Sequence, residues 1–347
     1  MSLVSLDIAL RSAAIALLLV LAAVLLRDAR RSVAGRLTIA LAVGTVAHAV
    51  TFNIGTAGAI ALWYVLLIAL STGTGVVLWL FCRAMFDDAF VLRPVHALVW
   101  LAVTTFSFVD CLWLAPVMGE RFAIVANNLL ALGFIALALI QTVRSWPSDL
   151  VEGRRRLRAF LVAAAMLYGG VNALLQVAAS GGQTAEVANV VNAALLVLVV
   201  AAITVTLLRV DTRDLFTTAE PVIAVADPMS AADRKLIDAL TRLMADERIY
   251  RQENVTIGTL AVRLSIPEYR LRRLINQRLG YRNFNAFLND HRIAEAKAAL
   301  ADPGQAEVPV ITIAMDAGFQ SLGPFNRAFK ETTGLTPSEY RRKAFAV

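Results

Sequence analysis

The sequence predicts an all-α protein in two parts: a bundle of seven transmembrane helices, followed by a helical domain with two helix-turn-helix units. Seven long apolar runs fill residues 3–208, and a polar, arginine-rich stretch follows them. Hydrophobic residues make up 58% of the chain and charged residues 17%, against roughly 45–50% and about 25% in soluble domains. We therefore expect a membrane domain over 1–208, a linker over 209–229 and a second domain over 230–347.

Each apolar run has the length of a membrane span. A helix of roughly 20 residues crosses a hydrocarbon core of about 30 Å. The runs lie at about 5–26, 37–54, 59–81, 95–115, 123–143, 159–179 and 187–208. The first run is followed by arginines and lacks a small-residue cleavage pattern, so we interpret it as a retained span and not as a signal peptide.

The arginines between the spans predict the orientation. Eleven arginines lie in alternate connections, and two more follow the last span, whereas the opposite connections hold only Arg121, with Arg11 early in the first span. Because basic residues concentrate on the cytoplasmic side, we expect an outside amino terminus, seven crossings and a cytoplasmic carboxyl-terminal domain. The expected location is the inner membrane of a bacterium.

Polar side chains within the spans predict a candidate ligand site in the membrane domain. With the expected orientation they fall in the outer halves of their spans, and they are His48, Asp110, Asn127, Asn128, Asn172, Gln176, Asn189 and Asn192. Polar groups are costly in hydrocarbon and usually face the bundle interior or a cavity. One interpretation is a ligand pocket open to the outside, with Asp110 as a charge partner; the other is hydrogen bonding between helices.

Several membrane chemistries are disfavoured. The first lysine is Lys235, so the spans cannot form a retinal Schiff base. His48 and His96 should lie about 16 Å apart along the membrane normal at 1.5 Å per residue, which argues against a shared metal or haem. Ser71 is close to His48 in depth, but no hydrolase motif accompanies it. Two cysteines imply no disulfide framework. We expect no enzyme activity, no catalytic residues, no metal and no cofactor.

The part after the linker begins with a helix predicted over 230–248, capped by Ser230, with apolar residues at helical spacing. It is either a packing helix of the domain or a dimerising stalk. From Arg251 to the end the chain carries 14 Lys and Arg against 9 Asp and Glu. This modest basic excess agrees with a polyanionic partner.

The first helix-turn-helix is predicted from Thr256 through Leu279. A short helix with a buried apolar face is followed by a turn at Ser265 and Ile266, and Pro267 starts the second helix. The outer face of that helix offers Tyr269, Arg270, Arg272, Arg273, Asn276 and Gln277. Arg can pair with guanine, and Asn or Gln with adenine, in the major groove.

The second unit follows a connecting helix over 283–300. It begins at Ile311, turns at Gly318 and runs to Gly334, and Thr336 caps a last short helix that starts at Pro337. The stretches 317–330 (AGFQSLGPFNRAFK) and 333–341 (TGLTPSEYR) resemble the signature of AraC/XylS-type transcription regulators. The resemblance covers about 230–343.

This resemblance implies two reading helices that enter successive major-groove segments of double-stranded DNA. By position it implies base contacts from Tyr269, Arg272 and Arg273, and from Asn326 and Arg327; we add Asn276 and Lys330 as DNA-binding candidates. The chain departs from the family at Leu322, Gly323 and Pro324, which have no side-chain hydrogen bond to offer, so the second unit is expected mainly to contact phosphate. The segment 302–309 also looks longer than usual.

The expected function is a membrane-embedded one-component transcription regulator that responds to an unknown signal. Dimerisation through the spans or the 230–248 helix would raise the local concentration of reading domains at paired sites. Two rivals remain: a membrane receptor or transporter whose helical tail binds protein, and an intramembrane enzyme with an attached regulator.

Overall fold

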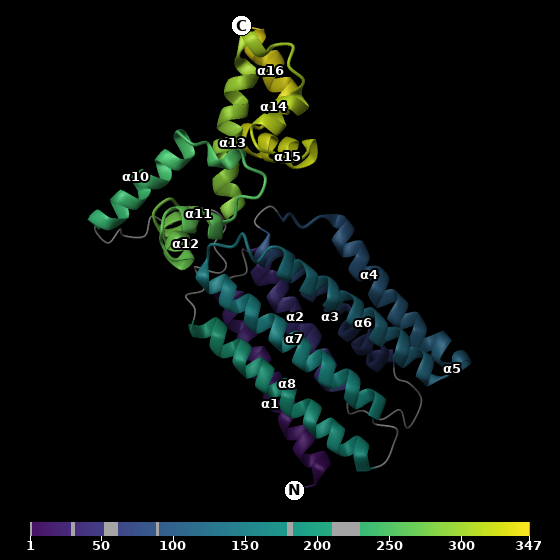
Figure 1. Cartoon of the computed structure of the whole chain (residues 1–347). Coiled ribbons are helices and arrows are strands. Elements are labelled where there is room, and N and C mark those ends of the chain that lie inside the picture. Colours follow the sequence, from purple (N-terminus) through teal and green to yellow (C-terminus); the bar gives the residue numbers. More distant parts are fainter. Residues whose placement is uncertain are drawn as a thin grey trace. The chain divides into compact units, whose positions relative to one another are not determined.

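The computed structural model describes residues 2–28, 32–51, 62–87, 90–178, 183–209 and 230–346. Within these ranges the chain is built from helices (Figure 1), with one isolated antiparallel bridge between Asp149 and Asn283. The chain divides into two compact units: Met1–Trp146 with Gly153–Glu220, and Pro147–Glu152 with Pro221–Val347. The predicted linker, apart from Arg209, lies outside the described residues.

The described residues of all seven apolar runs are helical. The helices are α1 (Leu3–Asp28), α2 (Val33–Thr51), α3 (Leu62–Phe86), α4 (Pro94–Val109), α6 (Glu120–Arg144), α7 (Glu152–Ala178) and α8 (Gln183–Arg209). The fourth run continues through a π-helical turn, η1 (Asp110–Leu114), into α5 (Ala115–Met118). The helix boundaries differ from the predicted span limits by up to seven residues, the largest difference being at the start of α7, Glu152 against a predicted 159.

Six of these helices are long and apolar enough to cross a membrane, by length and composition. They are the helices of the first five runs and α8, and α7 is not among them. Helix α7 carries four arginines in its first two turns and then a stretch without Asp, Glu, Lys or Arg over 159–178, where several side chains lie outside the described residues. The seventh crossing therefore stays a prediction.

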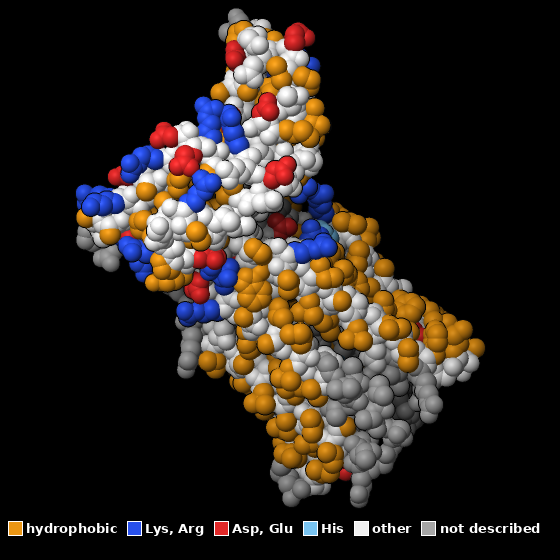
Figure 2. All heavy atoms as spheres, in the orientation of Figure 1, with side chains coloured by type: hydrophobic (Ala, Val, Ile, Leu, Met, Phe, Trp, Pro, Cys, Tyr) orange, Lys and Arg blue, Asp and Glu red, His pale blue; other side chains and the backbone are white. Residues whose placement is uncertain are grey.

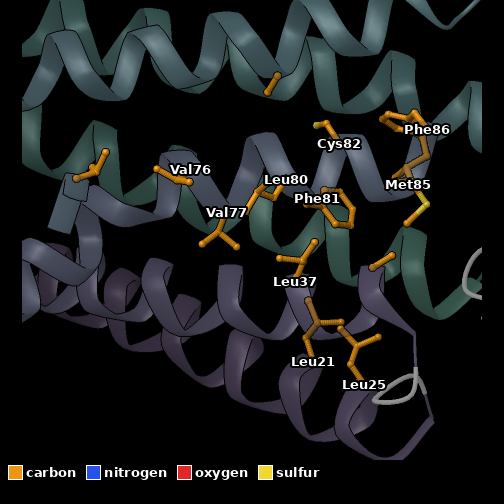
Figure 3. Close-up of a cluster of buried hydrophobic side chains, with 14 residues drawn as sticks. Leu21, Leu25, Leu37, Val76, Val77, Leu80, Phe81, Cys82, Met85 and Phe86 are labelled. Atoms are coloured by element: carbon orange, nitrogen blue, oxygen red, sulfur yellow. The ribbon is translucent and has the colours of Figure 1, made fainter. Parts of the chain in front are cut away.

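Helix α3 lies at the centre of unit 1, where it packs against α2, α4 and α6, while α1 packs against α2 and α8. Its carboxyl-terminal half carries a dense row of buried side chains from Val76 to Phe86, and Leu37 of α2 and Leu21 and Leu25 of α1 complete the same cluster (Figure 3). Burial of this row fixes the relative positions of the three helices.

The outside of unit 1 is apolar as well. Figure 2 shows hydrophobic side chains over most of its visible described surface, whereas Lys and Arg are spread over the carboxyl-terminal unit. Leu98, Leu129 and Leu198 are each more than 60% exposed. A helix that is hydrophobic all round belongs in a core or in lipid, and an apolar surface this extensive marks a contact with a membrane or another protein.

Unit 2 contains α10 (Ala231–Ala245), η2 (Ile249–Arg251), α11 (Ile257–Arg263), α12 (Glu268–Gln277), α13 (Phe284–Ala301), η3 (Pro303–Gln305), α14 (Val310–Asp316), α15 (Leu322–Thr333) and α16 (Pro337–Phe345). The predicted caps are confirmed: Ser230 accepts from the backbone N–H of Asp233, and Thr336 from that of Glu339. Side-chain caps satisfy amide groups that a helix leaves free at its start.

Unit 2 has two hydrophobic cores that share one helix. The first half of α13 supplies Phe284, Phe287 and Leu288 to a core with α10, α11 and α12. Its second half supplies Ile293, Ala296 and Leu300 to a core with α14 and α15. Helix α13 therefore holds the two helix-turn-helix units in a fixed spacing.

The segment Pro147–Glu152 joins unit 2 although it lies between α6 and α7 in the sequence. Leu150, 3% exposed, is part of the first core. No sequence pattern predicted this contribution.

Candidate nucleic-acid interface

The turn of the first helix-turn-helix depends on one left-handed residue. Ser265 has φ +53°, and the amide of Ile266 then donates to the carbonyl of Ala261 at 3.0 Å. Thr256 forms a capping box with Thr259 at the start of α11, and Pro267 is the N-cap of α12. The predicted start of α12 is thus confirmed to within one residue, and the helix ends at Gln277, two residues before the predicted Leu279.

Helix α12 exposes one clear polar stripe. Tyr269, Arg273 and Gln277 are spaced four residues apart and are all exposed, with Tyr269 at 66%. Residues at this spacing lie on one face of a helix. On the opposite side Leu271, Leu274 and Ile275 are buried. The stripe therefore has the geometry of a groove-reading surface.

The other two predicted residues of α12 have partners within the domain. Arg272 forms an ion pair with Glu268, one turn earlier, and its side chain is 13% exposed. Asn276 donates from Nδ2 to the carbonyl of Tyr281 at 3.0 Å. Both residues remain DNA-contact candidates, and in this structure their bonds stabilise α12 and the turn that follows it.

An acidic residue lies beside the exposed stripe. Asp233 of α10 lines a small hollow together with Arg270, Arg273 and Gln277, and it forms an ion pair with Arg278 at 3.6 Å. Helix α10 therefore packs within the domain, next to the reading helix. This contact supports the packing interpretation of the 230–248 helix, although it does not test dimerisation.

The turn after α12 is well fixed. The hydroxyl of Tyr281 donates to Asp290 at 2.5 Å, and its backbone N–H donates to the carbonyl of Ile275 at 3.2 Å. Burial and the bond to the Asp290 carboxylate raise the pKa of Tyr281 to about 12. The phenol therefore stays protonated and keeps donating near neutral pH.

The second unit makes its turn with a glycine, as predicted. Gly318 has φ +96°, and a Cβ there would lie 2.6 Å from the carbonyl oxygen of Tyr250. On α15, Phe325 and Phe329 are buried, while Asn326, Arg327 and Lys330 are exposed. The three predicted side chains of this unit therefore share a solvent-facing surface.

The start of α15 is different from that of α12. Gly323 and Pro324 are exposed, Leu322 packs against the second core, and a Cβ added at Gly323 would meet nothing within 4 Å. The exposed start of this helix thus presents little side-chain hydrogen-bonding capacity to a base edge.

The residues that join the two helix-turn-helix units were not predicted from the sequence. Arg292 of α13 donates to the carbonyl of Tyr250 at 2.7 Å and lies over the ring of Phe319. Glu295, one turn later, pairs with Arg251 and Arg248. Isolated charges on a helix are usually solvated, so only the folded structure shows that these residues connect the two helix-turn-helix units.

In unit 1, several predicted pocket residues hydrogen-bond to each other. Asn127 donates to the buried carboxylate of Asp110 at 2.7 Å and accepts from Thr72 at 3.3 Å. The Thr72 hydroxyl also lies 3.0 Å from that of Ser107. This cluster ties α3, the π-helical turn and α6 together.

A second cluster lies around His48. Its ring nitrogens lie 3.2 Å from the Ser71 hydroxyl and 3.0 Å from that of Tyr168. Asn192 donates to Asn172 at 2.9 Å, and the carbonyl of Asn189 accepts from Arg11, which is paired with Asp7. Asn128 is half-buried on α6; Gln176 is on α7, and its side chain lies outside the described residues.

A cavity of about 610 Å³ lies elsewhere in unit 1, between α2, α3 and the start of α4. Its walls are mainly apolar and include Leu37, Val43, Leu70, Val77, Ala97 and Trp100, and Arg93 and His96 line it at the start of α4. The Nδ1 atom of His96 accepts from the backbone N–H of Arg93 at 3.0 Å. A neutral His96 ring therefore carries its proton on Nε2. None of the predicted pocket residues lines this cavity.

Residues 260–343 match the family model described as a helix-turn-helix domain. The chain is 30% identical over 114 residues to the arabinose operon regulatory protein of Escherichia coli, and 29% to that of Salmonella typhimurium. The matched region covers 33% of this chain and about a third of each relative, 36% and 37%.

Two solved structures are similar to the same region. One is the C-terminal domain of AraT, a response regulator from Geobacillus stearothermophilus, at 27% identity and a TM-score of 0.28, covering 33% of this chain and 88% of that one. The other, from Listeria innocua, has 26% identity and a TM-score of 0.27, covering 31% and 94%.

Proposed function

We propose that the carboxyl-terminal part of the chain is an AraC-type helix-turn-helix domain, since it matches a helix-turn-helix family model and the arabinose operon regulatory protein; apolar helices long enough to span a membrane precede it. From this combination we propose a membrane-embedded one-component transcription regulator of the bacterial inner membrane. A signal received by unit 1 changes the operator binding of unit 2. No enzyme activity is proposed, since the curated relatives are named as regulatory proteins.

The segment Pro147–Glu152 supports seven crossings. It belongs to the same compact unit as the DNA-binding domain, so the α6–α7 connection and that domain lie on one side of the membrane. Among the described helices, α7 and α8 lie between them in the sequence. If α8 crosses, α7 must cross as well. The arginines at this end of α6 and α7 favour the cytoplasmic side.

The proposed DNA contacts divide between the two units. Tyr269, Arg273 and the neighbouring Arg272 and Asn276 serve the first major-groove segment, with Gln277 added from the exposed stripe. Asn326, Arg327 and Lys330 serve the second, mainly through phosphate. A homodimer would place two such DNA-reading domains at paired sites. Single-molecule subunit counting at the operator tests this proposal, and finding monomers there would contradict it.

We place the proposed signal site in the cavity between α2, α3 and α4 and not among the polar groups in the outer halves, because many of those groups already bond to one another. The cavity volume, about 610 Å³, falls within the roughly 300–1,000 Å³ of small-molecule sites. Apolar walls with Arg93 and His96 at one end favour a long-chain amphiphile with an anionic head, such as a fatty acid of the membrane.

Tryptophan quenching tests this signal site. A brominated long-chain fatty acid added to the protein in nanodiscs should quench Trp100, and the Trp100→Phe variant should identify that part of the signal. Ala97→Phe, which fills the cavity, should abolish it. Ala102→Phe is the matched control, since Ala102 is an exposed alanine of the same helix outside the cavity lining. Equal quenching in both variants would reject the site.

Selection from random double-stranded DNA tests the function itself. The full-length protein in nanodiscs should enrich a two-part sequence, and its affinity should fall steeply with salt as counterions are released. Failure to enrich any sequence, together with capture of a cytoplasmic protein by the same domain, would favour the receptor or transporter alternative.

A further inference from the structure

The connection between α6 and α7 contributes a short strand-like piece to the DNA-binding unit. The backbone N–H of Leu150 donates to the carbonyl of Arg282 at 3.1 Å, and that of Phe284 donates to the carbonyl of Ser148 at 2.8 Å. Between these two bonds Asp149 faces Asn283 in an antiparallel bridge. Two bonds in register make this an ordered pairing and not a chance approach of two loops.

The side chains of the segment are buried too. Asp149 and Leu150 are 2% and 3% exposed, and Leu150 packs in the same core as residues of α10, α11 and α12. Connections between helices normally run over the surface. The first helix-turn-helix therefore has a core that is completed by a residue from between two span helices.

Tyr281, the residue next to those paired with this segment, is bonded to the reading helix. Arg282 and Phe284 flank the turn that follows α12, and the carbonyl of Tyr281 accepts from Asn276 on α12. The Tyr281 N–H donates to Ile275 of the same helix. A continuous path of short contacts thus leads from Ser148 and Leu150 to the end of α12.

The flanks of the segment are fixed within unit 1. Arg155 donates to the carbonyl of Trp146 at 3.1 Å. Arg158, 1% exposed, donates to the carbonyl of Thr142 at 2.9 Å and to the Ser145 hydroxyl at 2.6 Å. The segment is therefore short and tied at both ends to α6 and α7.

We infer that Pro147–Glu152 is the regulatory contact through which the span helices act on the first DNA-reading helix. This inference rests on the proposed function. A shift of α6 against α7 displaces the segment, loosens the turn at Tyr281–Asn283 and lowers the affinity of α12 for DNA. The state in which Pro147–Glu152 is paired with residues 282–284 is the DNA-binding state.

Disulfide trapping tests the docking. Asp149 and Asn283 form a non-hydrogen-bonded antiparallel pair, whose Cα atoms lie about 4.5 Å apart, within the range a disulfide spans. Asp149→Cys with Asn283→Cys, in a chain with Cys82→Ala and Cys111→Ala and a protease site within 209–229, should stay in one piece after cleavage until reduced. Separation of the halves without reductant would overturn the docking; each single cysteine variant is the control.

DNA affinity tests the regulation. Leu150→Ala in the full-length protein should weaken binding to the selected DNA by roughly fivefold or more, the usual scale of coupling between sites, and should speed hydrogen exchange of the Phe284 amide. Val151→Ala removes a similar side chain that lies outside the core and should leave both unchanged. Faster exchange with unaltered affinity would overturn the regulatory role.

The oxidised double-cysteine variant keeps the inference testable if Leu150→Ala does not fold. It should bind DNA at least as tightly as the reduced form, and weaker binding when oxidised would contradict the assignment of the docked state. Absence of DNA binding by the unmodified protein would instead reject the proposed function, so the two failures are distinct.

Discussion

The two helix-turn-helix units make the same kind of turn with different residues. Each needs a left-handed residue at its turn, which is Ser265 in the first unit and Gly318 in the second. The second turn lies against other backbone, at Tyr250 and Arg251. The reading helices differ as well: α12 begins with polar and charged residues, and α15 with Leu322, Gly323 and Pro324. We therefore propose that the first unit reads bases and that the second mainly holds the domain on DNA.

The largest expected effect concerns the two turns. Gly318→Ala combines an unfavourable positive φ with a backbone clash, and we expect a loss of at least about 2 kcal/mol in the free energy of unfolding. Ser265→Gly, at the matching position of the first unit, should change it by less than about 1 kcal/mol. Denaturant melting of the full-length protein in detergent measures both. Equal losses would show that the close packing at Gly318 is unimportant.

Base reading by the first unit is the next test. Arg273→Ala should cost roughly 1–3 kcal/mol at one base position of the selected DNA and relax the preference there. Arg273→Lys keeps the charge but loses bidentate pairing, so it should also relax the preference while retaining the salt dependence. Binding to a panel of single-base variants provides the measurement. A loss that is uniform over all sequences would mean that Arg273 contacts phosphate only.

The second unit should respond differently. Arg327→Ala is expected to weaken binding by a similar factor on every sequence and to reduce the slope of affinity against salt by about one phosphate contact. Titrations at several salt concentrations on the selected and on unrelated DNA separate the two cases. A change confined to one base position would make α15 a reading helix equal to α12.

The smallest effect is expected at Gly323. An alanine there meets no neighbour and improves helix propensity, so Gly323→Ala should stabilise the protein by roughly 0.5–1 kcal/mol. DNA affinity should stay within about a factor of two, on the order of 0.4 kcal/mol. Thermal melting and DNA titration of the same sample check both values. A large loss of affinity would show that DNA approaches the backbone closely at this position.

Local patterns predicted the elements well. Apolar length found seven helices, caps at Ser230 and Thr336 marked two helix starts, and Gly318 marked the second turn. Contacts distant in the sequence were not predictable. A single leucine in the short α6–α7 connection is part of no periodic pattern, so the sequence could not show that Leu150 is buried in the first core of unit 2. Likewise, depth in the membrane grouped Asp110, Asn127 and His48, but could not show which of them bond to one another.

The candidate site was predicted in the same uneven way. Helical spacing identified the exposed side chains of α12 and α15, because burial follows the apolar positions of each helix. It did not show that Arg272 and Asn276 already have partners at Glu268 and Tyr281, since those contacts depend on rotamers and on the following turn. The cavity at Arg93 and His96 was missed because its walls are ordinary apolar span residues.

Recovery of crosslinked DNA through tags at the two ends of the chain tests the central claim most directly. In the proposed mechanism the DNA-binding domain occupies its operator while still joined to the membrane helices. A tag at the amino terminus and a tag at the carboxyl terminus should therefore recover the same genomic sites with similar enrichment. Recovery through the carboxyl-terminal tag alone would show that a released fragment, and not the membrane-embedded protein, binds DNA.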